Sequence, residues 1–187
     1  MPMLLLVIGI IIFSGIHLVA TFPDLRHRLV NRLGEGPYKG TFAAIALVGL
    51  LLIIIGKARA DVVPLWEVPG WGRAAALAVM PVAFILLAGA YLPTNIKRFT
   101  SHPMLWGVVI WAVAHLLANG DLASLLLFGG LGAFALAMMW SEYTHKAVLS
   151  NKRQPFSRDL ITVGAGILLY GVFLVVHPHL FGAAVIT

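Results

Sequence analysis

The sequence contains no cysteine and very little charge. Of 187 residues, 11% are charged and 60% are hydrophobic. The absence of cysteine excludes disulfide bonds, thiolate metal sites and cysteine nucleophiles, so any bound metal must be held by nitrogen, oxygen or methionine sulfur. The scarcity of charge excludes a water-soluble globule, because a chain of this length needs more polar residues to cover its surface. The composition therefore predicts an integral membrane protein.

Positive charge has a different role in a membrane protein than in a soluble one. A formal net charge of +6 would indicate a nucleic-acid partner if the chain were soluble. Here the basic residues lie in short segments between apolar runs, where they determine membrane orientation. We therefore expect the lipid bilayer, and not nucleic acid, as the partner of these charges.

Six apolar runs are candidates for membrane-spanning helices. A straight span needs about 20 residues, and the second, fourth and sixth runs are shorter than that. The first run lacks a basic segment and a cleavage site, so we expect a retained helix and not a signal peptide. No internal repeat is evident, and we predict one all-α domain, residues 1–187, as an integral membrane bundle of six transmembrane helices. The predicted spans are Pro2 to Phe22, Thr41 to Gly56, Ala74 to Leu92, Met104 to Ala118, Leu122 to Trp140 and Leu160 to Val176.

The distribution of basic residues predicts the orientation of the bundle. Segments 22–40, 93–103 and 141–159 lie on one side of the membrane and carry ten lysines and arginines, whereas the other side carries Lys57, Arg59 and Arg73. The positive-inside rule makes the first side cytoplasmic and both termini external. Within the spans, we expect Pro81 to kink its helix and free a carbonyl. In the turn "NGD", Asp121 is expected to cap the next helix.

Two of the seven histidines, His17 and His115, fall inside predicted spans. A buried imidazole is costly unless it is bonded, and an interhelical hydrogen bond would explain each histidine taken singly. As a pair without cysteine, and with small residues beside them, they favour the two axial nitrogen ligands of a haem iron. Their predicted depths differ by several ångströms, so the helices or the ring would have to tilt.

The remaining histidines have weaker predictions. His102 is expected to be an N-terminal cap or an interface anchor, and His177 with His179 is expected to mark the end of the last helix. Either His102 or His177 could replace one ligand of the pair. His27 and His145 are interpreted as solvated interface residues. The residues expected to bind the cofactor are His17, His115, Arg26, Arg28, Arg98, Trp111, Ala112 and Asn119, with the arginines as propionate partners or as topology determinants alone.

Four sequence blocks resemble one known family. The blocks "GIHLVATFPDLRHRL", "GEGPYKGTFA", "HPMLWG…WAVAHLLANGD" and "HPHLFG" resemble the NnrU family over nearly the whole chain. The resemblance implies a bacterial inner-membrane protein, multi-pass with periplasmic termini, that is linked to denitrification and nitric oxide metabolism. Plant relatives of the family include the 15-cis-zeta-carotene isomerase, a haem b enzyme that isomerises a carotenoid double bond without net redox change.

The resemblance also bears on the histidines. Carried over by motif, the axial ligands of the isomerase fall on His17 and His115, and its cysteine one turn before the second ligand falls on Ala112. An exchange between cysteine and histidine as ligand is therefore impossible in this chain. The resemblance does not decide whether the chain is an enzyme; if it is one, a haem-dependent isomerase or redox enzyme is expected. The expected ligand is nitric oxide or a polyene.

Two other functions compete with the haem protein. The segment "SHPMLWG" also resembles the "RHPxYxG" element of S-adenosylmethionine-dependent membrane methyltransferases of the isoprenylcysteine and phospholipid type. Ser101 replaces the arginine of that element, and only Glu142 offers a carboxylate where those enzymes have a pair. The third alternative is a partner of the denitrification machinery without chemistry of its own, in which the histidines make interhelical bonds.

Overall fold

The computed structural model describes residues 1–144 and 149–181, with side chains given through Ser141 and again from Leu149. The order of elements is α1 (Pro2–Val19), α2 (Pro23–Leu33), α3 (Glu35–Arg59), α4 (Gly72–Tyr91), η1 (Asn95–Arg98), α5 (Pro103–Ala118), α6 (Leu122–Ser124), η2 (Leu125–Gly129), α7 (Gly130–Thr144) and α8 (Phe156–Phe181). The predicted all-α membrane bundle is confirmed. Helix α7 continues from α6 through one π-helical turn, η2.

The number and length of the spans differ in part from the prediction. Within the described residues, five helices are long and apolar enough to cross a membrane, and α5, with 16 residues, is a shorter apolar helix. Helices α3 and α8 have 25 and 26 residues, so the second and sixth spans are not short. Both helices continue past the ends of their apolar runs because their polar end residues can reach the interface.

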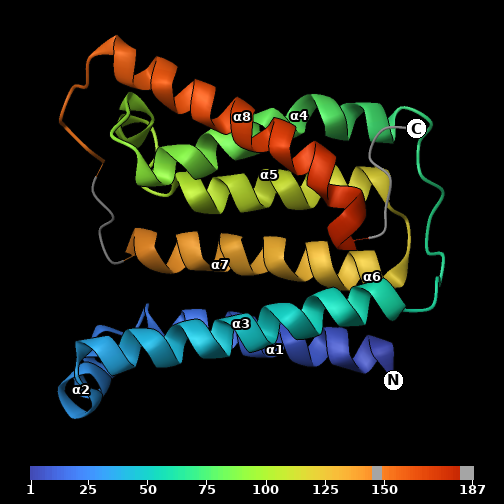
Figure 1. The fold of residues 1–187 in the computed structure, drawn as a ribbon, viewed down its shortest axis with the longest axis horizontal. Coiled ribbons are helices and arrows are strands. Elements are labelled where there is room, and N and C mark those ends of the chain that lie inside the picture. The colour runs from blue at the N-terminus through green and yellow to red at the C-terminus, as the bar shows by residue number, and fades with distance from the viewer. Residues whose placement is uncertain (145–148, 182–187) are drawn as a thin grey trace.

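The helices pack in layers (Figure 1). The pair α1 and α3 forms one side, α7 lies next to it, α5 follows, and α4 with α8 forms the other side. Glycines bring α1 and α3 together. A Cβ atom added to Gly49 would lie 2.8 Å from the backbone nitrogen of Phe13, and one added to Gly56 would overlap the backbone of Leu6. Small residues that let backbones approach in this way are the usual basis of helix pairing in lipid.

The bundle has two distinct ends. At the basic end lie α2, η1 and residues 149–155, which together carry most of the basic residues (Figure 1). At the opposite end lie the N-terminus, the loop 60–71 and the turn between α5 and α6. Successive spanning helices therefore run in alternating directions, as expected from the assignment of the loops to the two sides of the membrane.

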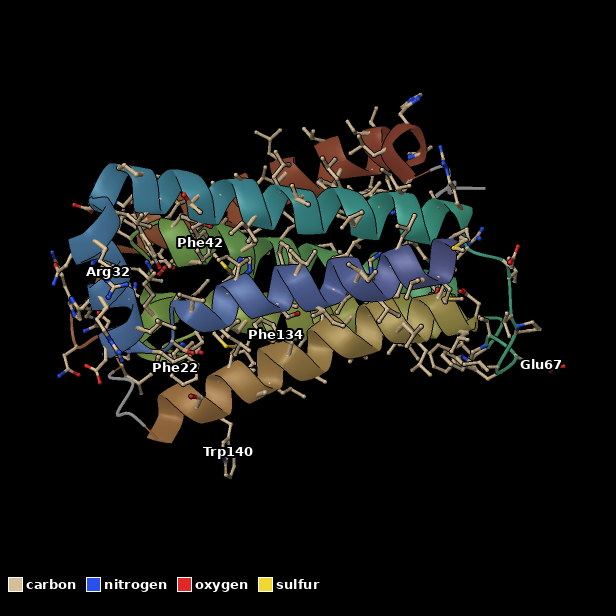
Figure 2. All side chains as sticks on the ribbon, turned by 90° about the horizontal axis from the view of Figure 1, so that it is seen from below. Phe22, Arg32, Phe42, Glu67, Phe134 and Trp140 are labelled. Carbon is tan, nitrogen blue, oxygen red and sulfur yellow. The ribbon has the colours of Figure 1, made fainter. Side chains whose placement is uncertain are left out.

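Helix α2 was not predicted, because segment 22–40 was interpreted as a loop. It starts at Pro23, a residue that suits the first helical position, and it ends before Gly34, whose φ of +84° favours glycine. It lies across the ends of α1 and α3 (Figure 2). The chain thus has a helix at the basic end that does not cross the bundle.

The mid-helix proline frees a carbonyl, as was expected. Pro81 lies inside α4 and has no N–H to donate to the carbonyl of Leu77, four residues earlier. That carbonyl instead accepts a hydrogen bond of 2.9 Å from the hydroxyl group of Tyr170 in α8. The free carbonyl of one helix therefore bonds a neighbouring helix.

At the basic end, a carboxylate of α8 bonds the segment before η1. Asp159 accepts hydrogen bonds from the hydroxyl group of Thr94, at 2.6 Å, and from the backbone and side chain of Asn95, at 2.8 and 2.7 Å. The segment before η1 and the first turn of α8 are thereby joined, although more than 60 residues separate them.

Candidate functional site

His115 lies near the end of α5, among aromatic rings. Its Nδ1 atom is 2.8 Å from the carbonyl oxygen of Trp111, one turn earlier. A carbonyl can only accept, so Nδ1 carries the proton and Nε2 has the free lone pair. The ring stacks on Phe128 with centroids 4.5 Å apart, and Trp111 lies 5.1 Å away. The imidazole is therefore held in one orientation with Nε2 as its only possible ligand atom.

His17 has a similar environment near the end of α1. Its Nδ1 atom is 2.6 Å from the carbonyl oxygen of Phe13, which again leaves Nε2 with the lone pair. The ring of Phe13 lies 4.4 Å away, and that of Phe42 in α3 lies 5.2 Å away. Each of the two predicted ligands is thus prepared by its own helix.

His17 and His115 lie at different depths in the bundle. Helices α1 and α5 run in opposite directions, so His17 lies toward the basic end and His115 toward the opposite end (Figure 1). A Cβ atom added to Gly132 of α7 would lie 2.9 Å from Ala112, and one added to Gly130 would lie 3.7 Å from Ile10, so these contacts align the three helices. Counted from them, His17 lies about 12 Å further toward the basic end than His115 along the helix axes.

Two nitrogen ligands of one metal lie about 2 Å from it on either side, so a haem shared by these two histidines would need tilted helices or a tilted ring. The pairing of His17 with His115 stays a prediction. Within the described residues, no group of three or more histidine, aspartate or glutamate side chains gathers to hold a metal ion.

The reserve candidates lie at different ends. His177, in the last turns of α8, is an electrostatic neighbour of His115, and its ring lies 5.0 Å from that of Phe181. His102 occupies the N-cap position of α5, at the basic end, but makes no side-chain capping bond, so the expected cap is wrong and the interface anchor stays a prediction. His177 and His179 lie in the last turns of α8, which includes Pro178 and is described to Phe181, so they mark the end of this helix as expected.

The arginines predicted as propionate partners are all at the basic end. The guanidinium group of Arg26 lies 5.9 Å from the centre of the Tyr38 ring, and Arg28 donates a bond of 3.3 Å to the backbone carbonyl of Asp24. Arg98 ends η1 and is exposed. They are on the side of His17 and His102, whereas His115 is at the other end.

The predicted residues around His115 have clear positions. Asn119 donates a bond of 2.8 Å from its side-chain nitrogen to the carbonyl oxygen of His115. Ala112 is 3% exposed and packs against Gly132 of α7, where an added Cβ would lie 2.9 Å away. Of the other sequence predictions, His27 is exposed on α2, as expected, and His145 and the side chain of Glu142 lie outside the described residues.

Two apolar cavities open on the sides of the bundle. One, of about 120 Å³, lies between α4 and α5 and is lined in part by Phe84, Met104 and Trp111. The other, of about 390 Å³, lies between α4 and α8 and is lined in part by Leu87, Tyr91 and Leu169. The first reaches Trp111, the residue that orients His115. Neither of them is lined by a histidine.

Sequence reasoning missed the ring that stacks on His115 and the ion pair close to it. Phe128 follows Asp121 by about as many residues as His115 precedes it. The antiparallel hairpin predicted at "NGD" would therefore place Phe128 beside His115, and this was the available signal. Lys57 donates to Asp121 at 2.9 Å and to the fully buried Ser124 at 2.7 Å. Burial raises the pKa of Asp121, but hydrogen bonds from Ser124 and Lys57 outweigh it and hold this pKa below its ordinary value.

The fold and the site together define a helical membrane protein with separately oriented histidines near the two ends of its bundle. The sequence profile of one family, described as NnrU protein, matches residues 5–185. The chain therefore belongs to the NnrU family, and the resemblance seen in the sequence is confirmed. No curated protein and no solved structure gives a significant match.

Proposed function

We propose that this NnrU-family protein binds one haem b through Nε2 of His115, with His177 as the second nitrogen ligand. The observation that carries the proposal is the hydrogen bond from Nδ1 of His115 to the carbonyl oxygen of Trp111. A histidine that ligates a metal usually donates its other ring N–H to such a partner, which fixes both the tautomer and the ring orientation. Stacking on Phe128 holds the same ring from its face.

The choice of His177 as the second ligand depends on helix direction. It lies in the last turns of α8, at the same end of the bundle as His115, and the two residues interact electrostatically. His17 has an equally prepared Nε2 atom but lies about 12 Å further toward the basic end along the helix axes. Two neutral imidazoles in an apolar interior are the donor set of a low-spin haem.

The role of the cofactor follows from the family resemblance. When bound, haem b supplies a redox centre and, if one imidazole dissociates, a site for a small ligand such as nitric oxide. The residues of this chain orient the ligands and exclude water, since Trp111 and Phe128 enclose His115. We therefore assign the protein to nitric oxide or denitrification metabolism in a bacterial inner membrane. The basic end faces the cytoplasm, and the termini are periplasmic.

The first experiment is the spectrum of the purified protein. A Soret band and a b-type pyridine haemochrome are expected, and nitric oxide added to the reduced protein should shift the Soret band. His115→Ala is expected to lose most of the haem, and His177→Ala to keep haem but change from a six-coordinate to a five-coordinate spectrum. His27→Ala is the matched control, because His27 is exposed on α2.

His17→Ala distinguishes the two possible histidine sets. It is expected to retain the haem, because His177, at the same end of the bundle as His115, is the proposed second ligand. A protein that stays colourless when haem is supplied during expression would refute the cofactor, and loss of haem in His17→Ala but not in His115→Ala would refute the site. Circular dichroism of each variant separates loss of ligand from loss of fold.

A further inference from the structure

Helix α2 presents an unusual combination of exposed side chains. Phe22, just before its first residue, is 57% exposed, and Leu25 and Leu33 are 38% and 48% exposed. Arg28 and Arg32, one turn apart, are exposed beside this apolar edge. A short helix with exposed leucines next to arginines has the composition of an interfacial helix, which lies in the plane of a membrane surface.

The geometry of the bundle supports this arrangement. Helices α1 and α3 cross the membrane, and α2 lies across their ends (Figure 2). A helix that lies across the ends of spanning helices runs along the membrane surface. Figure 2 also shows Arg32 at the basic end of the molecule, beyond the ends of the spanning helices. The helix is therefore at the level of the lipid headgroups.

The two arginines differ from the other cations of the same region. Lys39 pairs with Glu35 at 2.7 Å, and Arg26 is held over the ring of Tyr38. Within the described residues, neither Arg28 nor Arg32 makes a salt bridge. Their charges are thus available to an external anion, and the nearest anions at this level of a membrane are lipid phosphates.

We propose that α2 binds anionic phospholipids, with Arg28 and Arg32 contacting the headgroup phosphate and with Phe22, Leu25 and Leu33 inserted beside the acyl chains. The occupant is a lipid and not free phosphate, because the apolar edge lies directly beside the cations. The proposal is independent of the haem site, which lies at the other end of the bundle.

Lipid selectivity provides the first test. Native mass spectrometry of the full-length protein in detergent, titrated with phosphatidylglycerol or phosphatidylcholine, is expected to give a clear preference for phosphatidylglycerol. Each arginine near an anionic surface contributes about five-fold, so Arg28→Gln combined with Arg32→Gln should weaken phosphatidylglycerol binding by about 25-fold. Lys152→Gln with Arg153→Gln removes the same charge from exposed positions between α7 and α8, and should change binding little.

Helix depth provides the second test, which the absence of native cysteine makes clean. A fluorophore on Leu25→Cys should be quenched by a lipid-attached quencher and protected from aqueous iodide. The opposite is expected for His27→Cys on the other face of α2. These measurements use vesicles of phosphatidylcholine and phosphatidylglycerol in a three-to-one ratio.

Several outcomes would overturn the proposal. Equal losses in the arginine pair and in the control pair would show that only overall charge matters. Displacement of phosphatidylglycerol by inorganic phosphate alone would indicate a phosphate site. Protection of the Leu25→Cys label from both quenchers would indicate that protein, and not lipid, covers this edge.

Discussion

Replacement of Asp121 by alanine removes the centre of the polar network near His115. The Asp121 carboxylate accepts bonds from Lys57 at 2.9 Å, from the Ser124 backbone nitrogen at 2.9 Å and from the Ser124 hydroxyl at 2.5 Å. The backbone of the same turn bonds the loop 60–71, since the carbonyl of Gly120 accepts from the nitrogen of Leu65 at 2.7 Å. The variant should therefore loosen the N-cap of α6, the end of α3 and this loop together.

The size of the effect follows from these contacts. Loss of an N-cap side chain costs about 1 kcal/mol, and loss of a charge-assisted hydrogen bond costs about 1.5 to 3 kcal/mol. The side chains of Lys57 and Asp121 are only 29% and 17% exposed, so solvent screens the pair incompletely. We expect Asp121→Ala to lower the unfolding free energy by about 2 to 4 kcal/mol, which corresponds to a melting temperature lower by about 5 to 15 °C. Asp121→Asn keeps the cap acceptor and should lose about half as much.

The pH dependence of this contribution has a definite sign. The folded protein holds the pKa of Asp121 below the ordinary value of 3.8. The network therefore contributes fully at pH values above the pKa of the unfolded chain, about 3.9, and its contribution falls as the pH drops toward the folded pKa. The stability difference between the wild type and Asp121→Asn should accordingly shrink below about pH 4.

Thermal unfolding in detergent, followed by circular dichroism, measures both effects. Glu67→Gln is the control, because Glu67 is exposed on the same loop and points away from the bundle (Figure 2). Lys57→Met should cost a similar amount, and the double variant should cost less than the sum of the single ones. Additive costs for Lys57 and Asp121, or a stability difference that grows as the pH falls, would refute the reasoning.

Three further predictions use the same unfolding measurement. Gly56→Ala should lower the unfolding free energy by about 1 to 3 kcal/mol, because its Cβ would overlap the Leu6 backbone. Gly40→Ala in the same helix meets open space and should be neutral or stabilising. Equal effects of the two substitutions would contradict the tight α1–α3 contact. Tyr170→Phe should lower the unfolding free energy by about 0.6 to 1.7 kcal/mol, because the hydrogen bond to the Leu77 carbonyl is lost. In a Pro81→Ala background the loss should be much smaller, since the Leu77 carbonyl regains its partner within the helix. An unchanged loss in that background would count against the assigned bond. Asp159→Asn should cost about 1 to 3 kcal/mol, since an amide cannot accept all the bonds from Thr94 and Asn95; a stability equal to the wild type would show that this contact is dispensable.

Much of the fold was readable from the sequence because hydrocarbon imposes few solutions on a chain. The apolar runs predicted the spanning helices, Pro81 predicted the free carbonyl of Leu77, and Asp121 predicted the cap that the structure has. Helix α2 was missed because polar residues between spans were interpreted as loop. Its leucines at positions 25, 29 and 33 recur every four residues, which was the available signal for an amphipathic helix.

Both oriented histidines of the candidate site were identified from the sequence, but which histidines can share one iron depends on helix direction. Depth counted from the start of a helix has opposite meanings in helices that run in opposite directions. The chain enters α1 from the opposite end and α5 from the basic end, so His17 and His115, both late in their helices, lie at different depths. The same rule places His102 toward the end that holds His17, and His177 toward the end that holds His115. Spectra of His17→Ala and His177→Ala therefore decide which of the two histidines shares the iron of His115.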